Sequence, residues 1–227
     1  MDFTNAVPSL PIVFEDRHLM VINKPAGLLS QGDHTGDPDV VGLAKEYLLR
    51  SGNQNNSPFV GPVHRLDRPV SGLMLLAKSS KDAQQLSEQI KNRTIQKIYR
   101  AIVEGKPPPN GLLVHHLLKN NNRNIVRVVN SGEPKAKRAE LSFVRIEHKE
   151  TLAQLSVHLQ TGRSHQIRVQ LAEAGYPIWG DYKYGLDQPD GRDMALQAAE
   201  LVFDHPATGK QQVFKLDRPE DAPWNRF

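Results

Sequence analysis

The chain has 227 residues, of which 38% are hydrophobic and 24% are charged, as in an ordinary globular protein that is long enough to bury a core. It has no cysteine, which excludes a disulfide framework, a thiolate nucleophile and a cysteine-based zinc site. The net charge of +4 favours an anionic partner without requiring one. No apolar run approaches the roughly 20 residues of a membrane-spanning helix. Residues 1–11 lack the features of a secretory signal, so we expect no membrane partner and a cytoplasmic location.

The first half of the chain shows both strand and helix patterns. Short continuous apolar runs indicate strands, and apolar residues at helical spacing indicate helices. The first helix has acidic residues before its first turn and Gly52 just past its end, and an amide-rich loop over residues 52–57 follows. In the last strand of this half, Lys97 and Tyr99 share one face and Arg100 lies on the other. We expect strands at residues 12–14, 19–23, 73–77 and 97–103, and helices at residues 39–51 and from Ser79 or Ser80 to about Arg93.

The second half of the chain is richer in strands. A proline-rich segment at residues 106–111 has the length of a loop rather than of a domain linker. After it, apolar and polar residues alternate, which predicts a sheet with one solvated face. A turn at residues 161–164 leads to a helix that we expect to be capped by Ser164, to bury Ile167 and to end at Gly175. We expect strands at residues 124–130, 139–147, 152–160, 196–203 and 212–216.

The order of these elements bounds the fold. Mixed strands with few helices predict an α+β domain built on a large, mostly antiparallel sheet. We find no internal repeat. We therefore expect residues 1–227 to form a single domain, with residues 1–10 as a flexible N-terminal segment.

Basic residues gather in two stretches of the chain. Such clusters are the electrostatic signature of nucleic-acid binding, although charge runs also occur simply as solvated faces. Composition alone leaves both interpretations open. The first cluster consists of Lys91, Arg93, Lys97 and Arg100, and the second of Arg123, Arg127, Lys135, Lys137 and Arg138.

The segment over residues 63–78 carries the strongest chemical signal. It places the carboxylate of Asp67 between Arg65 and Arg68, and the permissive Gly72 comes just before an unbroken apolar run. An ionised and positioned carboxylate can act as a nucleophile, as a base or only as a member of an ion pair. The local sequence by itself favours a charged surface turn over a catalytic loop.

Three motifs, taken together and in order, resemble those of the RNA pseudouridine synthases, in the branch typified by RluA. They are His64-Arg65-Leu66-Asp67 followed by Pro69-x-Ser71-Gly72, then residues 96–103, then residues 159–168, with weaker similarity at residues 23–27, 180–185 and 205–209. The resemblance implies an α+β fold with a long mixed sheet in two halves and a central active-site cleft. It also implies an isomerisation that adds and removes no atoms, so we expect no metal and no small-molecule cofactor. Because the family pattern starts by Ile12, we expect the catalytic domain alone, without the S4-like module of some relatives.

The same resemblance assigns Asp67, Tyr99 and Arg168 to catalysis. Asp67 is the catalytic carboxylate, and the sequence does not decide whether it attacks the sugar or removes a sugar proton. Arg168 pairs with Asp67 and keeps it charged and oriented. Tyr99 lies on the target base and assists the loss of the C5 proton. Without the motifs, Arg168 would be interpreted as a surface arginine and Tyr99 as a core tyrosine.

Further residues are expected to bind the substrate. The target base must leave its stack, and the resemblance places Arg65 in the space that the base vacates and Ile167 in an apolar wall of the pocket. We also expect His64, Arg163 and His165 on the RNA side, although the histidines fit structural positions equally well. Two residues depart from the family pattern, since Gln170 and Gln197 stand where many relatives have histidine, and this puts fine positioning of the RNA in doubt.

The sequence therefore predicts an RNA uridine isomerase that acts as a monomer on ribosomal RNA, transfer RNA or both. Two alternatives stay open. One is an RNA-binding protein of the same fold without turnover. The other is a hydrolase of glycosidic bonds, although most such enzymes need two carboxylates around the scissile bond.

Overall fold

The computed structural model describes residues 10–52, 57–185 and 191–227. Most of the segment expected to be flexible, residues 1–10, and the centre of the expected amide-rich loop lie outside the described residues. The elements in chain order are β1 (Ile12–Glu15), β2 (Leu19–Lys24), α1 (Val40–Arg50), β3 (Gly61–Pro62), β4 (Ser71–Ala77), α2 (Ser80–Asn92), β5 (Gln96–Glu104), β6 (Asn110–Asn120), β7 (Ile125–Val129), β8 (Lys137–Lys149), β9 (Leu152–Leu159), α3 (Gln166–Glu173), β10 (Leu196–Asp204), β11 (Gln211–Lys215) and a final 3-10 turn (Trp224–Arg226).

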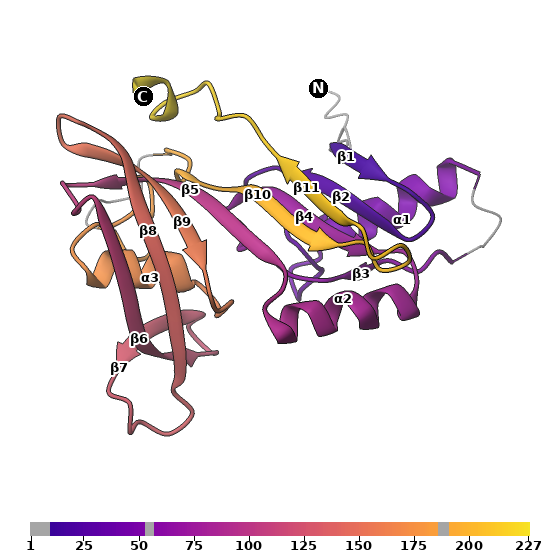
Figure 1. The fold of residues 1–227 in the computed structure, drawn as a ribbon, viewed down its shortest axis with the longest axis horizontal. Helices are drawn as coiled ribbons and strands as arrows, with labels where there is room; N and C mark the ends of the chain where they lie inside the picture. Colours follow the sequence, from indigo (N-terminus) through magenta and orange to yellow (C-terminus); the bar gives the residue numbers. More distant parts are fainter. Residues whose placement is uncertain (1–9, 53–56, 186–190) are drawn as a thin grey trace.

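Within the described residues, the strands form one 11-stranded sheet in the order β1-β2-β4-β10-β5-β9-β8-β6-β7, with β11 beside β10 and β3 beside β4. The pairing of β4 with β10 is parallel, whereas the other strand pairs named here are antiparallel. Figure 1 shows β5 and β10 running between a half that carries β1 to β4 with α1 and α2, and a half that carries β6 to β9 with α3. The expected α+β fold with a large, mostly antiparallel sheet is confirmed.

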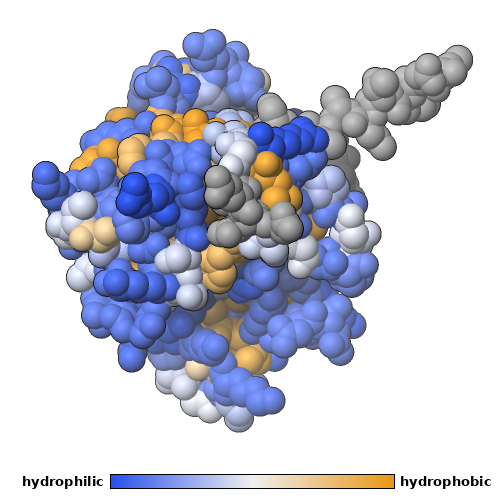
Figure 2. All heavy atoms as spheres, turned by 90° about the vertical axis from the view of Figure 1, so that its right-hand side faces the viewer, coloured by the Kyte–Doolittle hydropathy of each residue, from blue (hydrophilic) through white to orange (hydrophobic). Residues whose placement is uncertain are grey.

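The strands β2 and β4 are buried on both faces. Met74 of β4 belongs to one hydrophobic cluster with Leu48 of α1, and Leu75 belongs to another with Leu86 of α2. The two helices therefore cover opposite faces of the same strands. This explains why β2 and β4 are continuous apolar runs, whereas a sheet with one wet face shows alternation. On the surface of this half, Figure 2 shows mostly hydrophilic side chains with smaller apolar areas between them.

Helix capping follows the sequence at α1 and α2 but not at α3. Asp39 accepts the backbone N–H groups of Val41 and Gly42 at the start of α1, and Ser79 accepts the N–H of Asp82 in α2. At α3 the expected cap by Ser164 is wrong, because the helix begins after His165, whose φ of 51° is left-handed and whose side chain makes no capping bond. Among the described helices, none combines the length and the apolar character needed to cross a membrane.

The long strand β6 was missed by the sequence analysis, and the loop expected at residues 106–111 ends where this strand begins. Leu113 and Leu117 turn toward buried partners, but Leu112 and Val114 on the opposite face are exposed. Because apolar residues occupy both faces, the segment shows no period of two, which is the signal that identifies a half-buried strand.

Gly72 sits where β4 and β10 run side by side. Its φ is +114°, and a Cβ atom added there would lie 2.4 Å from the carbonyl oxygen of Ala198 in β10. Only glycine meets both conditions, because it has no Cβ and tolerates positive φ. The strand β4 begins directly after the loop that carries Asp67. The glycine of the central motif thus allows this strand to pair closely with β10.

We expect Gly72→Ala to lower the free energy of unfolding by at least about 3 kcal/mol, because the methyl group collides with backbone that cannot move without shifting β10. Urea denaturation measures this loss. Gly209→Ala is a matched control, since Gly209 also has a positive φ of 67° but a Cβ there meets nothing within 4 Å. For the control we expect about 1 kcal/mol. Equal losses in the two variants would contradict the steric explanation.

Candidate active site

A cleft of about 1420 Å³ opens between the two halves of the sheet. Its walls come from segments far apart in the sequence, including residues 29–33, 62–69, 90–99 and 158–165. The cationic side chains that line it, besides the buried Arg168, are Arg65, Arg68, Lys91, Arg93, Lys97, Lys119, Arg163 and Lys183. A cleft with so many cations attracts a polyanion such as a nucleic acid.

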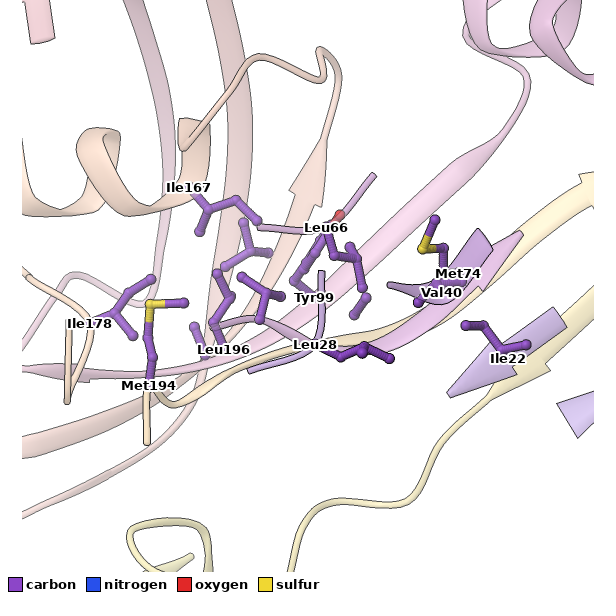
Figure 3. Close-up of a cluster of buried hydrophobic side chains, with 14 of the residues drawn as sticks. Ile22, Leu28, Val40, Leu66, Met74, Tyr99, Ile167, Ile178, Met194 and Leu196 are labelled. Atoms are coloured by element: carbon purple, nitrogen blue, oxygen red, sulfur yellow. The ribbon is translucent and has the colours of Figure 1, made fainter. Parts of the chain in front are cut away.

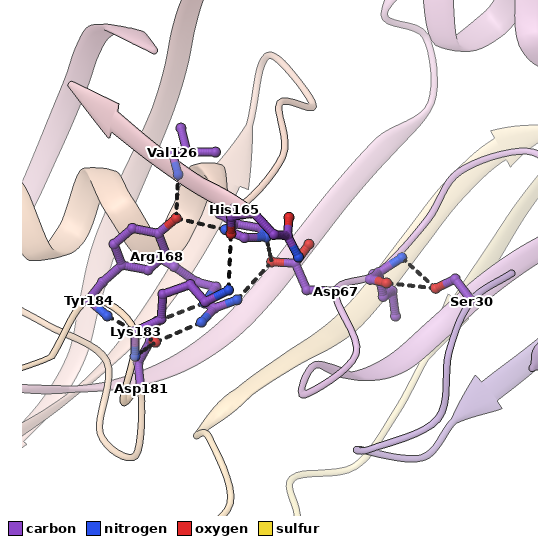
Figure 4. A network of polar contacts seen from close by, with 10 residues as sticks. Ser30, Asp67, Val126, His165, Arg168, Asp181, Lys183 and Tyr184 are labelled. Atoms are coloured by element: carbon purple, nitrogen blue, oxygen red, sulfur yellow. Dashed lines mark hydrogen bonds and ion pairs between the residues drawn. The ribbon is translucent and has the colours of Figure 1, made fainter. Parts of the chain in front are cut away.

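Asp67 lies on the loop of residues 63–70, called the Asp67 loop below, which neighbouring backbone and side chains hold in place. The hydroxyl of Ser30 donates to the carbonyl oxygen of Leu66 at 2.6 Å and accepts the N–H of the same residue at 3.0 Å (Figure 4). The N–H of Gly27 donates to the carbonyl oxygen of Arg68 at 2.9 Å. Leu66 is buried, whereas the side chain of Asp67 is 25% exposed and lines the cleft. The loop therefore presents one carboxylate from a fixed backbone.

Lys24 supports the same loop from inside the protein. The residue is fully buried, and its ammonium group donates to the carbonyl oxygens of Pro25, Leu28 and Arg68 at 2.8, 2.7 and 3.1 Å. All three hydrogens of the ammonium group are thus used. Burial lowers the pKa of Lys24 to about 8, although the charge of Asp67 opposes this shift.

The buried Lys24 makes stability depend on pH in an unusual range. Its pKa is about 8 in the folded chain and 10.5 ordinarily, so the unfolded chain binds more protons between these values. We expect Lys24 to raise the free energy of unfolding by about 3 kcal/mol as the pH goes from below 8 to above 10.5. Subtracting the urea-unfolding curve of Lys24→Met isolates this contribution from other titrating groups. Parallel pH curves for the two proteins would contradict the lowered pKa.

Arg168 of α3 joins two carboxylates (Figure 4). Its Nη1 donates to Oδ2 of Asp67 at 3.2 Å, while its Nε and Nη2 donate to the two carboxylate oxygens of Asp181, each at 2.7 Å. Arg168 and Asp181 are both buried. Burial lowers the pKa of Arg168, but the hydrogen bonds and charges of Asp181 and Asp67 outweigh it and raise this pKa above its ordinary value. The bidentate pair fixes the guanidinium so that its remaining edge faces Asp67.

The arginines beside Asp67 in sequence are not its partners. Arg68 turns to the surface, where its Nη1 donates to Asp37 at 2.7 Å and its Nε to the carbonyl oxygen of Gly27 at 2.9 Å. Arg65 is exposed and lines the cleft. The charge that neighbours the carboxylate therefore comes from Arg168, about a hundred residues away in the sequence.

Tyr99 and Ile167 form the apolar part of the site. Together with Asp67 and Arg168 they line a small pocket of about 60 Å³. Figure 3 shows Ile167 from α3, Leu66 from the Asp67 loop and Tyr99 from β5 directed into one cluster. Burial, and next the charge of Asp67, raise the pKa of Tyr99, so its phenol stays neutral at physiological pH. The ring can therefore stack on a base, whereas a phenolate acting as a base is strongly disfavoured.

The expected substrate-binding residues occupy different positions. Arg163 is exposed and lines the cleft, with its Nε donating to the carbonyl oxygen of Arg138 at 3.1 Å. His165 is buried, and its Nε2 lies 4.0 Å from Oδ2 of Asp67.

His64 accepts the N–H of Leu75 in β4 through Nε2 at 3.2 Å, and its Nδ1 is buried. Burial lowers the pKa of His64 to about 3. His64 is thus neutral, and it lines the cleft although its Nε2 is occupied by the backbone of β4.

The first basic cluster is divided by the alternation of β5. Lys97 lines the cleft with Lys91 and Arg93, but Arg100 lies on the other face and donates to Oε1 of Gln197 at 2.9 Å.

The two glutamines in place of histidine are both buried and do not line the cleft. Gln170 donates to the carbonyl oxygen of Leu113 in β6 at 3.1 Å. Both glutamines therefore act in packing of the sheet rather than in direct contact with a ligand.

Sequence analysis missed the roles of Asp181, Lys24, Ser30 and Tyr184. Asp181 and Tyr184 lie in one of the weaker family-like segments, residues 180–185, and Lys24 lies in another, residues 23–27. The weak family resemblance of those two segments was the only sequence signal that could have pointed to these three residues. The roles of all four residues depend on contacts with Arg168, His165 and the Asp67 loop, which no spacing in the sequence reveals.

Comparisons with known proteins identify the family of the chain. A family model described as RNA pseudouridylate synthase matches residues 18–173. The chain is 34% identical over 227 residues to the ribosomal large subunit pseudouridine synthase D of Nitrosomonas europaea. This match covers 95% of this chain and 64% of that protein. It is also 34% identical to the protein of the same name from Pseudomonas aeruginosa, over 95% of this chain and 70% of that one. The chain thus spans about two thirds of the length of these relatives.

Solved structures show the same fold. The structure titled human RNA pseudouridylate synthase domain containing 4 superimposes with a TM-score of 0.77 at 23% identity, covering 92% of this chain and 88% of that one.

Proposed function

The chain belongs to the RNA pseudouridylate synthase family, and from this we propose that it converts uridine in RNA to pseudouridine at the Asp67 site. The observation that carries the proposal is the carboxylate of Asp67, held 3.2 Å from Nη1 of Arg168 where a cation-lined cleft meets the buried ring of Tyr99. This arrangement offers a charged group to the sugar and a flat surface to the base.

Asp67 starts the reaction as a charged carboxylate, either by attacking C1′ of the uridine or by removing a sugar proton. In both routes the N1–C1′ bond breaks with its electron pair going to N1, the uracil turns while it remains in the pocket, and C5 bonds to C1′. This last bond displaces Asp67 from C1′ in the first route, and in the second Asp67 returns the proton to the sugar. C5 then loses its proton to water and N1 takes up a proton, so no atoms are gained or lost overall. Arg168 keeps the carboxylate charged and oriented. The rigid loop reduces the cost of placing it correctly.

Tyr99 and Arg65 handle the base. The neutral ring of Tyr99 supports the flipped uracil by stacking, which lets the base rotate without leaving. Arg65 is exposed beside Asp67, where it can fill the gap that the flipped base leaves in the RNA. Ile167 closes the apolar side of the pocket.

The substrate class is a structured RNA. The names of the bacterial relatives favour ribosomal RNA of the large subunit over transfer RNA as the target. We propose further that the chain works in the cytoplasm as a monomer. We also propose that it forms a single catalytic domain, which the continuous sheet supports.

Tritium release from RNA labelled at uracil C5 tests the proposal, because forming the C5–C1′ bond displaces the C5 proton. We expect the protein to release tritium without added metal or nucleotide and to leave pseudouridine in the digested RNA. Tight binding without release would favour an RNA-binding protein that does no chemistry. Free uracil in the products would favour hydrolysis. Hydrolases of glycosidic bonds mostly need two carboxylates, and Asp181 cannot serve as the second because it is buried with both oxygens bonded to Arg168.

A further inference from the structure

The hydroxyl of Tyr184 stands at the junction of three elements. The backbone N–H of Val126 in β7 donates to its oxygen at 2.8 Å, and the same oxygen lies 2.7 Å from Nδ1 of His165, just before α3 (Figure 4). Since the backbone N–H can only donate, the hydroxyl hydrogen is free to be donated to Nδ1. Tyr184 thereby links β7 to the site.

This contact, together with the charge of Asp67, selects one tautomer of His165. If Nδ1 accepts from Tyr184, the ring hydrogen is on Nε2, which lies 4.0 Å from Oδ2 of Asp67. The opposite tautomer would direct the Nε2 lone pair at the carboxylate oxygen, which is repulsive. Burial lowers the pKa of His165 despite the opposing charge of Asp67, so the ring is neutral. An N–H dipole therefore faces the catalytic carboxylate.

The turn that carries Tyr184 also fixes Arg168. Asp181 accepts the backbone N–H groups of Lys183 and Tyr184 at 3.0 and 3.3 Å while it binds Arg168. The guanidinium of Arg168 lies 5.2 Å from the centre of the Tyr184 ring. One short turn thus sets both neighbours of Asp67, with Asp181 positioning Arg168 and Tyr184 positioning His165.

The other end of the link is the β6–β7 hairpin, residues 110–129. Its tip carries the exposed cations Lys119, Arg123 and Arg127, and Lys119 lines the cleft. Within the described part of the chain, no ion pair involves any of the three. Lys183 donates to the carbonyl oxygen of Asn124 at 3.0 Å, so the hairpin is joined to the 181–185 turn at a second point. Phosphates that bind to this tip would fix the position of β7, the strand whose Val126 N–H donates to Tyr184.

We propose that Tyr184 is a positioning residue that couples docking of RNA phosphates on the β6–β7 hairpin to the catalytic carboxylate, by holding His165 with its Nε2–H toward Asp67. The inference deepens the proposed function and rests on it. Tyr184 does not line the cleft or the small pocket and acts through His165.

The tautomer is tested on the RNA-free protein by nitrogen NMR of the labelled His165 ring. We expect hydrogen on Nε2 in the wild type and a substantial share of the Nδ1–H form in Tyr184→Phe, which keeps the ring over Arg168 and removes only the hydroxyl. Hydrogen on Nδ1 in the wild type, or the same spectrum in both proteins, would overturn the proposal.

The kinetic consequence is tested by single-turnover pseudouridine formation at saturating RNA. We expect Tyr184→Phe to slow this step about tenfold, the effect of one hydrogen bond, and to leave the RNA dissociation constant unchanged. Tyr182→Phe is the matched control, because the hydroxyl of Tyr182 donates to the carbonyl oxygen of Arg192 at 2.9 Å and the residue does not line the cleft. An unchanged rate in Tyr184→Phe, or an equal loss in the control, would overturn the positioning role.

Coupling to the hairpin requires a double variant. At saturating RNA, we expect the single variant Lys119→Ala to be about threefold slower than the wild type in the single-turnover step. We expect the double variant Lys119→Ala/Tyr184→Phe to be no slower than Tyr184→Phe alone. Additive effects would overturn the coupling. If the wild type itself forms no pseudouridine, the proposed function fails, whereas the nitrogen spectra still decide the contact between Tyr184 and His165.

Discussion

We expect Asp67→Asn to abolish tritium release, with a loss of about 10⁴-fold or more, because the amide is neither a nucleophile toward C1′ nor a base. Single-turnover assays with labelled RNA measure the loss. Binding of RNA should persist, since the cations that line the cleft are unaltered. The fold should persist as well, because the Asp67 loop is held by its backbone contacts with Ser30, Gly27 and Lys24 rather than by the carboxylate.

Asp37→Asn is the matched control for this variant. It makes the same chemical change at a surface carboxylate that is 42% exposed and pairs with Arg68, whose side chain is 49% exposed. An exposed pair of this kind contributes at most about 1 kcal/mol, so we expect full activity and nearly unchanged stability. Residual activity of Asp67→Asn near that of the control would remove Asp67 from the chemistry and leave the cleft as a binding site only.

The second large effect concerns the buried pair of Arg168 and Asp181. We expect Asp181→Asn to lower the free energy of unfolding by about 3 kcal/mol, because a buried guanidinium loses its charged partner. We also expect a 10²- to 10³-fold loss of activity, since Arg168 is then no longer aimed at Asp67. Urea denaturation and single-turnover assays on the same preparation measure the two quantities.

A double-mutant cycle separates stability from function at this pair. Arg168→Met should be destabilising by itself because it leaves Asp181 buried and charged. The double variant Arg168→Met/Asp181→Asn should be more stable than the sum of the single effects by about 2 kcal/mol, yet inactive. Strictly additive stability changes would show that the two side chains do not interact as the distances indicate. Glu46→Gln, at an exposed pair with Arg50, should change neither quantity.

Local sequence predicted most of the secondary structure, because the strands and helices that support the site follow simple periodicities. The strand β6 escaped because its apolar residues face both ways, and the start of α3 escaped because His165 takes a left-handed conformation in place of a capped one. For the site, the motifs led to Asp67, Tyr99 and Arg168. They did not reveal that Arg68 pairs with Asp37, that Nε2 of His64 binds the backbone of β4, or that Asp181 and Tyr184 contact the neighbours of the carboxylate. Each of these facts depends on a contact between segments that are distant in the chain.

The parallel pairing of β4 with β10 has a consequence for how activity arises during folding. Because β10 lies between β4 and β5, the sheet half that bears Asp67 cannot join the half that bears Arg168 until this late segment of the chain is in place. Closing such long loops is slow compared with forming local helices. Recovery of activity after dilution from denaturant should therefore lag behind recovery of the helical signal of α1 and α2. Catalytic competence thus reports the completion of folding rather than its early steps.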